Sequence, residues 1–373
     1  MKILIVTETI GGKGHEKAAQ SVAEALRKLE AGCTITQVSL LAIASKSIER
    51  LLRFVYMAII KRFPALWRWM YQRESGFAFL FKQLIARMLA SRLRSFFNDE
   101  KPDLVIATHA AGLVALARLK EEKGFNLAVI FTDFQVNSFW INQQVDYYFV
   151  AHGQFKESLV NKYGIAREKV FITGIPINQD FAKTSGLSLN SNNSRINHFN
   201  ILIMGGGLGL GGIEEIIDSL NKLVFLPIRI TVVTGTNSKL FLEIRKLQEK
   251  NAIPLRVFRY VESIHLLLRE SDLLITKAGG LTISEALATA TPILIYKPIP
   301  GQEERNVAFL LKAKAAIRVN SLEYLVYWVQ YLYSHPAVYQ KLRYREQLIA
   351  KPNAARNIAE VLLEGIYHQA AEK

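Results

Sequence analysis

The sequence has one cysteine and no long apolar run, and each shortage excludes a class of protein. Cys33 is the single cysteine among 373 residues, so no disulfide can form within the chain, which suits a reducing compartment. Residues 41–94 form a basic, aromatic segment in which a membrane anchor would be expected, and their longest apolar run is "FVYMAII" at 54–60. A membrane-spanning helix needs about 20 apolar residues. In the opening "MKILIVTETI", Glu8 interrupts the apolar run too early for a signal peptide. We therefore expect no span, and any membrane contact to be peripheral.

Metal-binding motifs and acidic residues are also scarce. The sequence contains no HExxH motif, no Cys/His cluster and no DxD pair, so we expect no metal site. The 47 lysines and arginines outnumber the 32 aspartates and glutamates and give a net charge of +15. Such an excess predicts a polyanionic partner, which is nucleic acid, anionic lipid or a phosphorylated substrate.

The positive charge is concentrated in the aromatic, helix-like segment 41–94. Eleven lysines and arginines against two glutamates give this segment +9, more than half of the net charge. Trp67 and Trp69 stand among them. One interpretation is helices on an anionic membrane surface, with aromatic rings at the headgroup boundary. The alternatives are helices packed on a domain with solvated arginines, and a nucleic-acid-binding stretch, although no recognition motif supports the second.

Two series of strand, turn and helix account for most of the remaining chain. Continuous apolar runs end in polar or glycine-rich turns and precede helical periodicity, first within 1–182 and again within 200–350. Runs this apolar predict parallel strands buried on both faces. Between the series, 183–199 is rich in serine and asparagine and predicts a linker. We therefore predict an α/β protein of two Rossmann-like, doubly wound domains that face a cleft, with 351–373 as a final helix returning to the first domain.

Two glycine-rich turns of the second series are candidates for phosphate binding. The run "GGGLGLGG" at 205–212 would let backbone amides approach a phosphate, and a tight turn needed only for packing is the alternative. In "KAGGLTISEA", Gly279 and Gly280 precede a helix whose first amides can hold a diphosphate. Thr282 and Glu285 in this helix also have the spacing of a capping box. Glu285 therefore has two interpretations, a helix cap or a carboxylate that binds ribose hydroxyls.

Polar side chains also follow the strands of the first series. His15 follows the turn "GKGH" at a helix start, where an imidazole stays neutral and suits a general base. Asp133 ends "LAVIFTD" at the carboxyl edge of the predicted sheet, where α/β proteins bind ligands. His109 ends "DLVIATH" in the same way. A structural role is the ordinary alternative for each of these residues.

Together these segments resemble the family of monogalactosyldiacylglycerol synthases and processive diacylglycerol glucosyltransferases, relatives of the peptidoglycan glycosyltransferase MurG. "GKGHEKAA" resembles the family's GxGHxxAA loop, "FTDFQVNSFW" resembles its TDxxxHxxW region, and "LLITKAGGLTISEALATATPILIYKPIPGQEERN" resembles its nucleotide-binding signature. The resemblance covers most of the chain and implies a GT-B fold. It also implies inverting transfer of a hexose from a UDP-sugar, a substrate rather than a cofactor, to a membrane lipid without a catalytic metal.

The resemblance also assigns site residues. His15 is the leading candidate for the base, and Asp133 is the alternative. The residues implied to bind the nucleotide sugar are Gly205, Gly206, Gly207, Phe258, Val261, Gly279, Gly280, Leu281, Thr282, Glu285, Gln302, Glu303 and Asn306. The residues implied to face the acceptor or the membrane are Gly12, Gly14, His109, Asn137, Trp67 and Trp69. A capping box explains none of the residues from Gln302 onward, whereas a bound nucleotide sugar does.

Asn137 departs from the family pattern, because it stands where the family has histidine. Asparagine can hydrogen-bond but cannot exchange a proton at neutral pH. The preferred hypothesis is a peripheral enzyme at the cytoplasmic face of the membrane that glycosylates diacylglycerol and has no nucleic-acid partner. A MurG-like transfer of N-acetylglucosamine to a polyprenyl-linked acceptor is an alternative. A catalytically impaired protein that binds UDP or lipid is another. The donor sugar and the number of sugars added stay open.

Overall fold

The structure, a computed structural model, describes residues 1–8, 13–39, 42–43, 54–55, 58–59, 62–63, 93–110, 112–184 and 198–371. Several sequence predictions lie outside these described residues. They are those on Gly12, Trp67 and Trp69, on most of the basic segment 41–94, and on 185–197 of the predicted linker.

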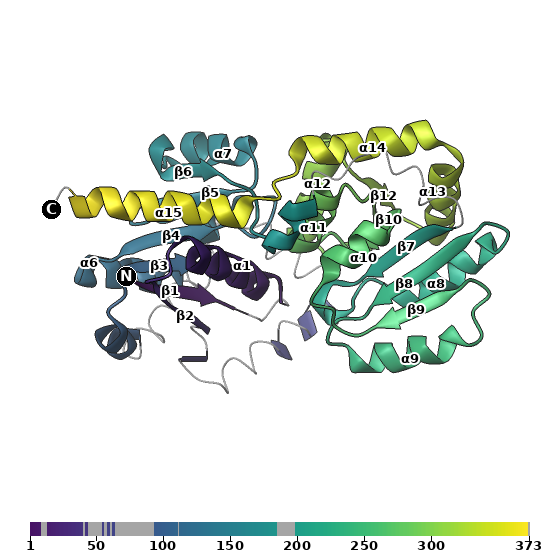
Figure 1. Ribbon diagram of the computed structural model, residues 1–373, viewed down its shortest axis with the longest axis horizontal. Helices are drawn as coiled ribbons and strands as arrows, with labels where there is room; N and C mark the ends of the chain where they lie inside the picture. The colour runs from purple at the N-terminus through teal and green to yellow at the C-terminus, as the bar shows by residue number, and fades with distance from the viewer. Residues whose placement is uncertain are drawn as a thin grey trace. The chain divides into compact units, whose positions relative to one another are not determined.

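The chain forms two compact units, each built on one parallel sheet (Figure 1). The first unit comprises Met1–Gln179, Pro300–Gln302 and Asn353–Lys373. The second comprises Asp180–Ile299 and Glu303–Pro352. In both units helices alternate along the chain with parallel strands, which confirms the predicted α/β class with two Rossmann-like halves.

The sheet of the first unit has the strand order β2-β1-β3-β4-β5-β6, with every neighbouring pair parallel. Its strands are β1 (Lys2–Thr7), β2 (Thr34–Ser39), β3 (Leu104–Ala107), β4 (Asn126–Ile130), β5 (Tyr147–Val150) and β6 (Val170–Ile172). All residues of β3 and β5 are buried, as their continuous apolar runs predict. The strand β2 was not predicted, because it lies at the sheet edge, reads "TITQVS" and has no buried residue.

The described part of this unit includes the helices α1 (Gly14–Leu29), α6 (Leu113–Lys123), α7 (Gly153–Tyr163) and α15 (Ala354–Ala371). Residues 93–100 are also helical. The last helix, α15, lies beside α1 (Figure 1). Its Ile358 and Leu362 are fully buried in a core shared with β1 and α1. A Cβ at Gly365 would overlap the Tyr147 side chain, so the close approach of α15 to β5 requires glycine.

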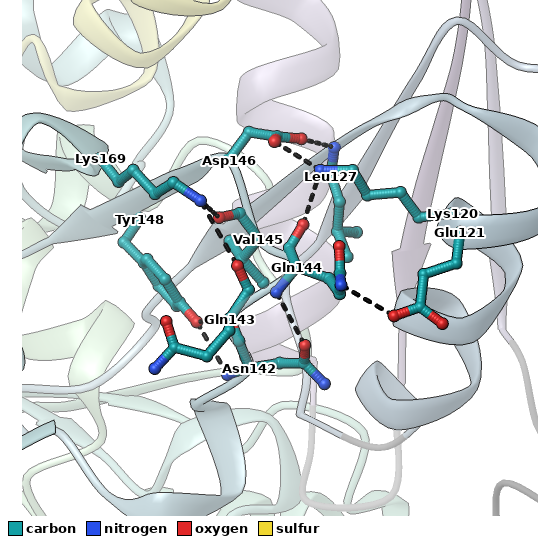
Figure 2. Close-up of polar contacts among 10 residues, drawn as sticks. All are labelled: Lys120, Glu121, Leu127, Asn142, Gln143, Gln144, Val145, Asp146, Tyr148 and Lys169. Atoms are coloured by element: carbon teal, nitrogen blue, oxygen red, sulfur yellow. Dashed lines mark hydrogen bonds and ion pairs between the residues drawn. The ribbon is translucent and has the colours of Figure 1, made fainter. Parts of the chain in front are cut away.

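A polar network fixes the loop that enters β5 (Figure 2). Lys120 of α6 forms an ion pair with Asp146, whose second carboxylate oxygen accepts a hydrogen bond from the Leu127 amide at 2.8 Å. Tyr148 donates to the carbonyl of Asn142 at 2.7 Å. These bonds lie at the amino ends of β4 and β5, whereas ligands of parallel sheets bind at the carboxyl ends. We therefore assign this network to stability.

The sheet of the second unit has the order β12-β11-β10-β7-β8-β9 and is also parallel. Its strands are β7 (Phe199–Met204), β8 (Ile228–Val233), β9 (Leu255–Phe258), β10 (Leu273–Thr276), β11 (Ile293–Tyr296) and β12 (Ile317–Val319). The accompanying helices are α8 (Ile213–Leu220), α9 (Ser238–Gln248), α10 (Ile264–Glu270), α11 (Gly280–Thr289), α12 (Gln302–Lys312), α13 (Leu322–Ser334) and α14 (Pro336–Ile349).

Each sheet has a switch point where the strand order reverses. It lies between β1 and β3 in the first unit and between β7 and β10 in the second. In open α/β sheets, ligands bind outside the carboxyl ends of the strands at such points. The chain after β1 leads to His15 and the chain after β3 to His109, while the glycine turns follow β7 and β10. Both groups of sequence candidates therefore lie where this rule places a ligand.

Candidate functional site

His15 is held by two strand-end residues of the first unit. It is the second residue of α1, and its Nδ1 lies 2.9 Å from the Thr108 carbonyl oxygen and 2.7 Å from the Thr132 hydroxyl oxygen. A carbonyl oxygen can only accept, so Nδ1 carries the proton and donates to Thr108. In the neutral ring Nε2 is then the nitrogen with the free electron pair. This tautomer makes Nε2 the atom that can accept a proton.

Burial keeps His15 neutral. It lowers the pKa of His15 from 6.5 to about 4, and the hydrogen bond to Thr108 opposes this only in part. The ring of His109 lies edge-on to that of His15 with centroids 4.7 Å apart. Burial, and then the neighbouring His15, lower the pKa of His109 well below its ordinary value. The first switch point therefore presents two uncharged imidazoles at neutral pH.

Asp133 and Asn137 lie in the loop after β4. Both are buried, with 8% and 4% of their surface exposed. The Asn137 side chain accepts a hydrogen bond from the Phe139 amide at 3.1 Å and caps the short 3-10 helix η1 (Ser138–Trp140). Trp140 in turn packs on Phe131, with ring centroids 5.1 Å apart. Asparagine therefore has a structural use at the position where the family has histidine.

The structure thus brings His15 and His109 together, with Gly14 at the first residue of α1. Two residues that orient the imidazole, Thr108 and Thr132, were not predicted from the sequence. Their signal is weak, because each is one threonine directly after an apolar strand.

The glycine turn after β7 is shaped largely by packing. A Cβ at Gly205 would overlap the backbone of Leu210, and the Gly207 carbonyl accepts hydrogen bonds from the Thr236 amide at 2.9 Å and hydroxyl at 2.8 Å. The helix that follows, α8, carries Glu214 and Glu215 in its first turn. These carboxylates already complement the positive end of the helix dipole and would repel a phosphate. The diphosphate is therefore expected at the other glycine turn.

The turn after β10 has the features of an anion site. The helix α11 begins at Gly280 with Gly279 as its N-cap, and its first turn contains no acidic residue. The first helical bond runs from Ile283 to the Gly279 carbonyl at 2.9 Å, which leaves the amides of Gly280, Leu281 and Thr282 without a partner inside the helix. Such amides and the helix dipole favour a phosphate.

The capping-box interpretation of Thr282 and Glu285 is wrong. The helix begins two residues before Thr282, and no side chain caps it. Thr282 therefore lies within the first turn rather than at the N-cap, and Glu285 is the sixth residue of the helix rather than N3. The ribose interpretation of Glu285 stays a prediction.

The helix α12 supports this turn from the next strand–helix unit. The Asn306 amide, which is fully buried, donates to the Ala278 carbonyl at 3.1 Å. Glu303 accepts a hydrogen bond from the Ile299 amide at 2.7 Å and forms an ion pair with Lys277. Gln302 is the first residue of α12. Glu303 and Asn306 therefore bond to the turn itself, which is a different contact from the one predicted with the donor sugar.

Two further predicted residues lie near β9. Phe258 is its last residue and is 37% exposed, whereas Val261 follows in the loop. β9 lies at the edge of the sheet, two strands away from β7. Their contact with a uracil stays a prediction.

The described residues contain neither a metal-binding cluster nor a membrane-spanning helix. There, no group of three or more His, Cys, Asp or Glu side chains is placed to hold a metal ion. No helix in that part of the chain is long and apolar enough to cross a membrane.

Comparisons with known sequences decide between the activities that this fold supports. Residues 15–177 match the monogalactosyldiacylglycerol (MGDG) synthase model, and residues 200–357 match the glycosyltransferase family 28 C-terminal domain. The processive diacylglycerol beta-glucosyltransferase of Bacillus cytotoxicus is 31% identical over 97% of this chain and 93% of its own. The chain belongs to the processive diacylglycerol β-glucosyltransferase family. A relative of the same name from Bacillus cereus is 33% identical over 85% of this chain and 81% of its own.

Solved structures of other members of this architecture confirm the GT-B fold. MurG of Acinetobacter baumannii superposes with a TM-score of 0.64 at 16% identity, covering 98% of this chain and 100% of its own. The UDP-GlcNAc 2-epimerase of Neisseria meningitidis, bound to UDP-GlcNAc, gives 0.62 at 17% identity, with the same coverage. A transferase and an epimerase match equally well, so the fold alone does not select the reaction. The sequence relationship places this chain among the glycosyltransferases.

Proposed function

We propose that this protein transfers a glucosyl group from UDP-glucose to diacylglycerol at a membrane surface, with inversion at the anomeric carbon. The observation that carries the proposal is the identity of 31% with a named diacylglycerol β-glucosyltransferase over 97% of the chain. The two switch points support it, since one offers an anion site and the other a neutral base.

The second unit would hold the donor. The amides of Gly280, Leu281 and Thr282 would bind the diphosphate, and Glu285 the ribose hydroxyls. Phe258 and Val261 would border the uracil. Each amide contact to a charged oxygen at a helix start contributes about 0.3–2 kcal/mol, and the part that grows with the charge on departing UDP raises the rate.

The first unit would supply the base. His15 Nε2 would accept the proton of the acceptor hydroxyl while that oxygen bonds to the anomeric carbon. The bond from this carbon to the phosphate oxygen breaks, and its electron pair leaves with UDP. General base catalysis of this kind contributes about 10²–10⁴ in rate. Asp133 is the alternative base, because it is buried in the loop after β4.

The basic segment 41–94 would bring the protein to its acceptor. Each lysine or arginine near an anionic surface contributes about 1 kcal/mol, so a net charge of +9 suffices for reversible binding even when discounted. We place the enzyme at the cytoplasmic face of the membrane, with neither nucleic acid nor a cofactor as partner.

Product analysis tests this proposal. The protein is incubated with labelled UDP-glucose, UDP-galactose or UDP-N-acetylglucosamine and with micelles containing diacylglycerol or a polyprenyl-linked acceptor, and the lipids are analysed by mass spectrometry. We expect glucosyldiacylglycerol in the β configuration, formed equally with and without a chelator. N-acetylglucosamine on the polyprenyl lipid would support the MurG-like alternative. UDP binding without any product would support an impaired homologue.

A further inference from the structure

Lys277 has been given no contact with a ligand so far, although it lies between β10 and the glycine pair. Its side chain is 11% exposed and forms an ion pair with Glu303, whose side chain is 6% exposed. The desolvation penalty for burying two charges offsets much of their Coulombic attraction, so such a pair is weak evidence for a purely stabilising role. Its position suggests a ligand instead.

The ammonium of Lys277 lies between the two glycine turns of the second switch point. A Cβ built on Gly206 would lie 3.5 Å from Lys277 Nζ, and one built on Gly279 would lie 3.6 Å from it. Neither glycine has a side chain to screen the cation. The charge is therefore adjacent to both the turn after β7 and the amino end of α11, where anions are favoured.

The ammonium also has more N–H donors than its ion pair with Glu303 uses. It carries three N–H groups, and within the described part of the chain its one hydrogen-bond acceptor is Glu303. Glu303 is itself fixed, because its other oxygen accepts from the Ile299 amide at 2.7 Å. The carboxylate thus holds the cation from one side and leaves its remaining donors available to a ligand.

We propose that Lys277 binds the diphosphate of the sugar donor and neutralises the charge that develops on the leaving UDP. This inference rests on the proposed function, because it names a contact with the substrate of that reaction. When the glycosyl–phosphate bond breaks, the electron pair stays on the phosphate oxygen, and a pre-positioned cation stabilises it without reorganising. Glu303 is a positioning residue that holds the ammonium before the donor arrives.

A matched control exists in the first unit. Asp146, like Glu303, joins a lysine through one oxygen and a backbone amide through the other (Figure 2). The side chains of Lys120 and Asp146 are 18% and 24% exposed. This pair lies at the amino ends of the strands of its sheet, whereas the switch point of that sheet binds ligands at the carboxyl ends. Lys120→Met therefore removes the same type of ion pair without touching the donor site.

Titration calorimetry with UDP, and ligand-observed NMR with uridine, test the proposal. Lys277→Met should weaken UDP binding by roughly 10- to 100-fold, the range for losing a hydrogen bond to a charged group, and leave uridine affinity unchanged. Its kcat should fall as well, because the contact strengthens in the transition state. Lys277→Arg should retain part of the UDP affinity, and Lys120→Met all of it. If Lys277→Met does not fold, Lys277→Gln, which can still donate to Glu303, is measured in its place.

Each other outcome counts against the role of Lys277. Equal losses of UDP and uridine affinity would indicate a collapsed site rather than a lost phosphate contact. Wild-type protein that binds UDP and transfers the sugar, beside a Lys277→Met variant that does both equally well, would overturn this inference and leave the proposed function standing. Wild-type protein that does not bind UDP would overturn both.

Discussion

The lowered pKa of His15 predicts an unusual pH dependence of glucosyl transfer. In the proposed mechanism His15 is the base and must be neutral to accept a proton, so activity would fall as pH drops through the pKa of His15. At about pH 5.5, a histidine with an ordinary pKa of about 6.5 would be only about 9% neutral, and the rate would fall about 10-fold from its value at about pH 7.5. With the pKa of His15 at about 4, about 97% of the ring is still neutral at about pH 5.5. The rate should therefore change by less than about 10%.

The assay measures the initial rate of glucosyl transfer from labelled UDP-glucose to diacylglycerol micelles. UDP-glucose is saturating at each pH, so that changes in its binding do not affect the measured rate. UDP affinity is measured in parallel. A 10-fold loss of kcat near pH 5.5 with no matching change in UDP affinity would refute the assignment of a buried, neutral His15 as base. Thr132→Val is a useful companion, because it removes the hydroxyl 2.7 Å from Nδ1 while keeping the bond to Thr108.

The same pKa has a consequence for stability, measured by urea unfolding at a series of pH values. The folded state binds the His15 proton only near pH 4, whereas the unfolded chain binds it near 6.5, so acidification favours unfolding. The free energy of unfolding should fall by at most about 2 kcal/mol between about pH 7.5 and 5 because of His15. A His15→Gln variant should show a correspondingly flatter pH dependence, and an identical slope would contradict the shifted pKa.

Three further predictions concern the donor turn and the membrane. Glu285→Ala should weaken UDP binding about 10-fold and abolish the preference for UDP over 2′-deoxy-UDP in calorimetry, whereas a retained preference would reject the ribose contact. Ala278→Gly should raise the free energy of unfolding by about 1 kcal/mol, because Ala278 has φ +78°, a backbone conformation that is strained for alanine; a lower urea midpoint would contradict this. Reversing the charge of Lys61, Arg62 and Arg68 to glutamate should reduce co-sedimentation with anionic vesicles by more than about 100-fold and leave binding to neutral vesicles little changed; equal binding of both proteins to anionic vesicles would exclude the membrane role of this segment.

The fold was largely predictable because its central strands are buried on both faces. Runs such as "KILIVT" and "DLLIT" leave little choice of structure, and the first of these runs is the whole of β1. The edge strand β2 and the three-residue β12 were not predicted, since neither contains a long apolar run. Sequence order alone also does not reveal where the strand order reverses, which is what brings the separate turns to one edge.

The candidate site was predictable where a motif is continuous and less so where it depends on contacts across the fold. The glycine pair before α11 stands out in the sequence, but the true start of that helix is decided by backbone geometry, and the capping box at Thr282 was therefore a wrong interpretation. Lys277 and Thr108 were not predicted to belong to the site. Each is a single polar residue after a strand, and its meaning comes from Glu303 or His15, which are distant in the sequence.

The packing of α15 on the first unit has a consequence for the order of folding. Residues 180–299 and 303–352, the second unit, lie in the chain between the sheet of the first unit and the helix that completes its core. The whole second unit is therefore synthesised before Ile358 and Leu362 can cover the apolar surface of β1 and α1. The second unit can fold as soon as it emerges, whereas the first, although most of it is translated earlier, must wait until α15 has been synthesised and exposes that surface until then.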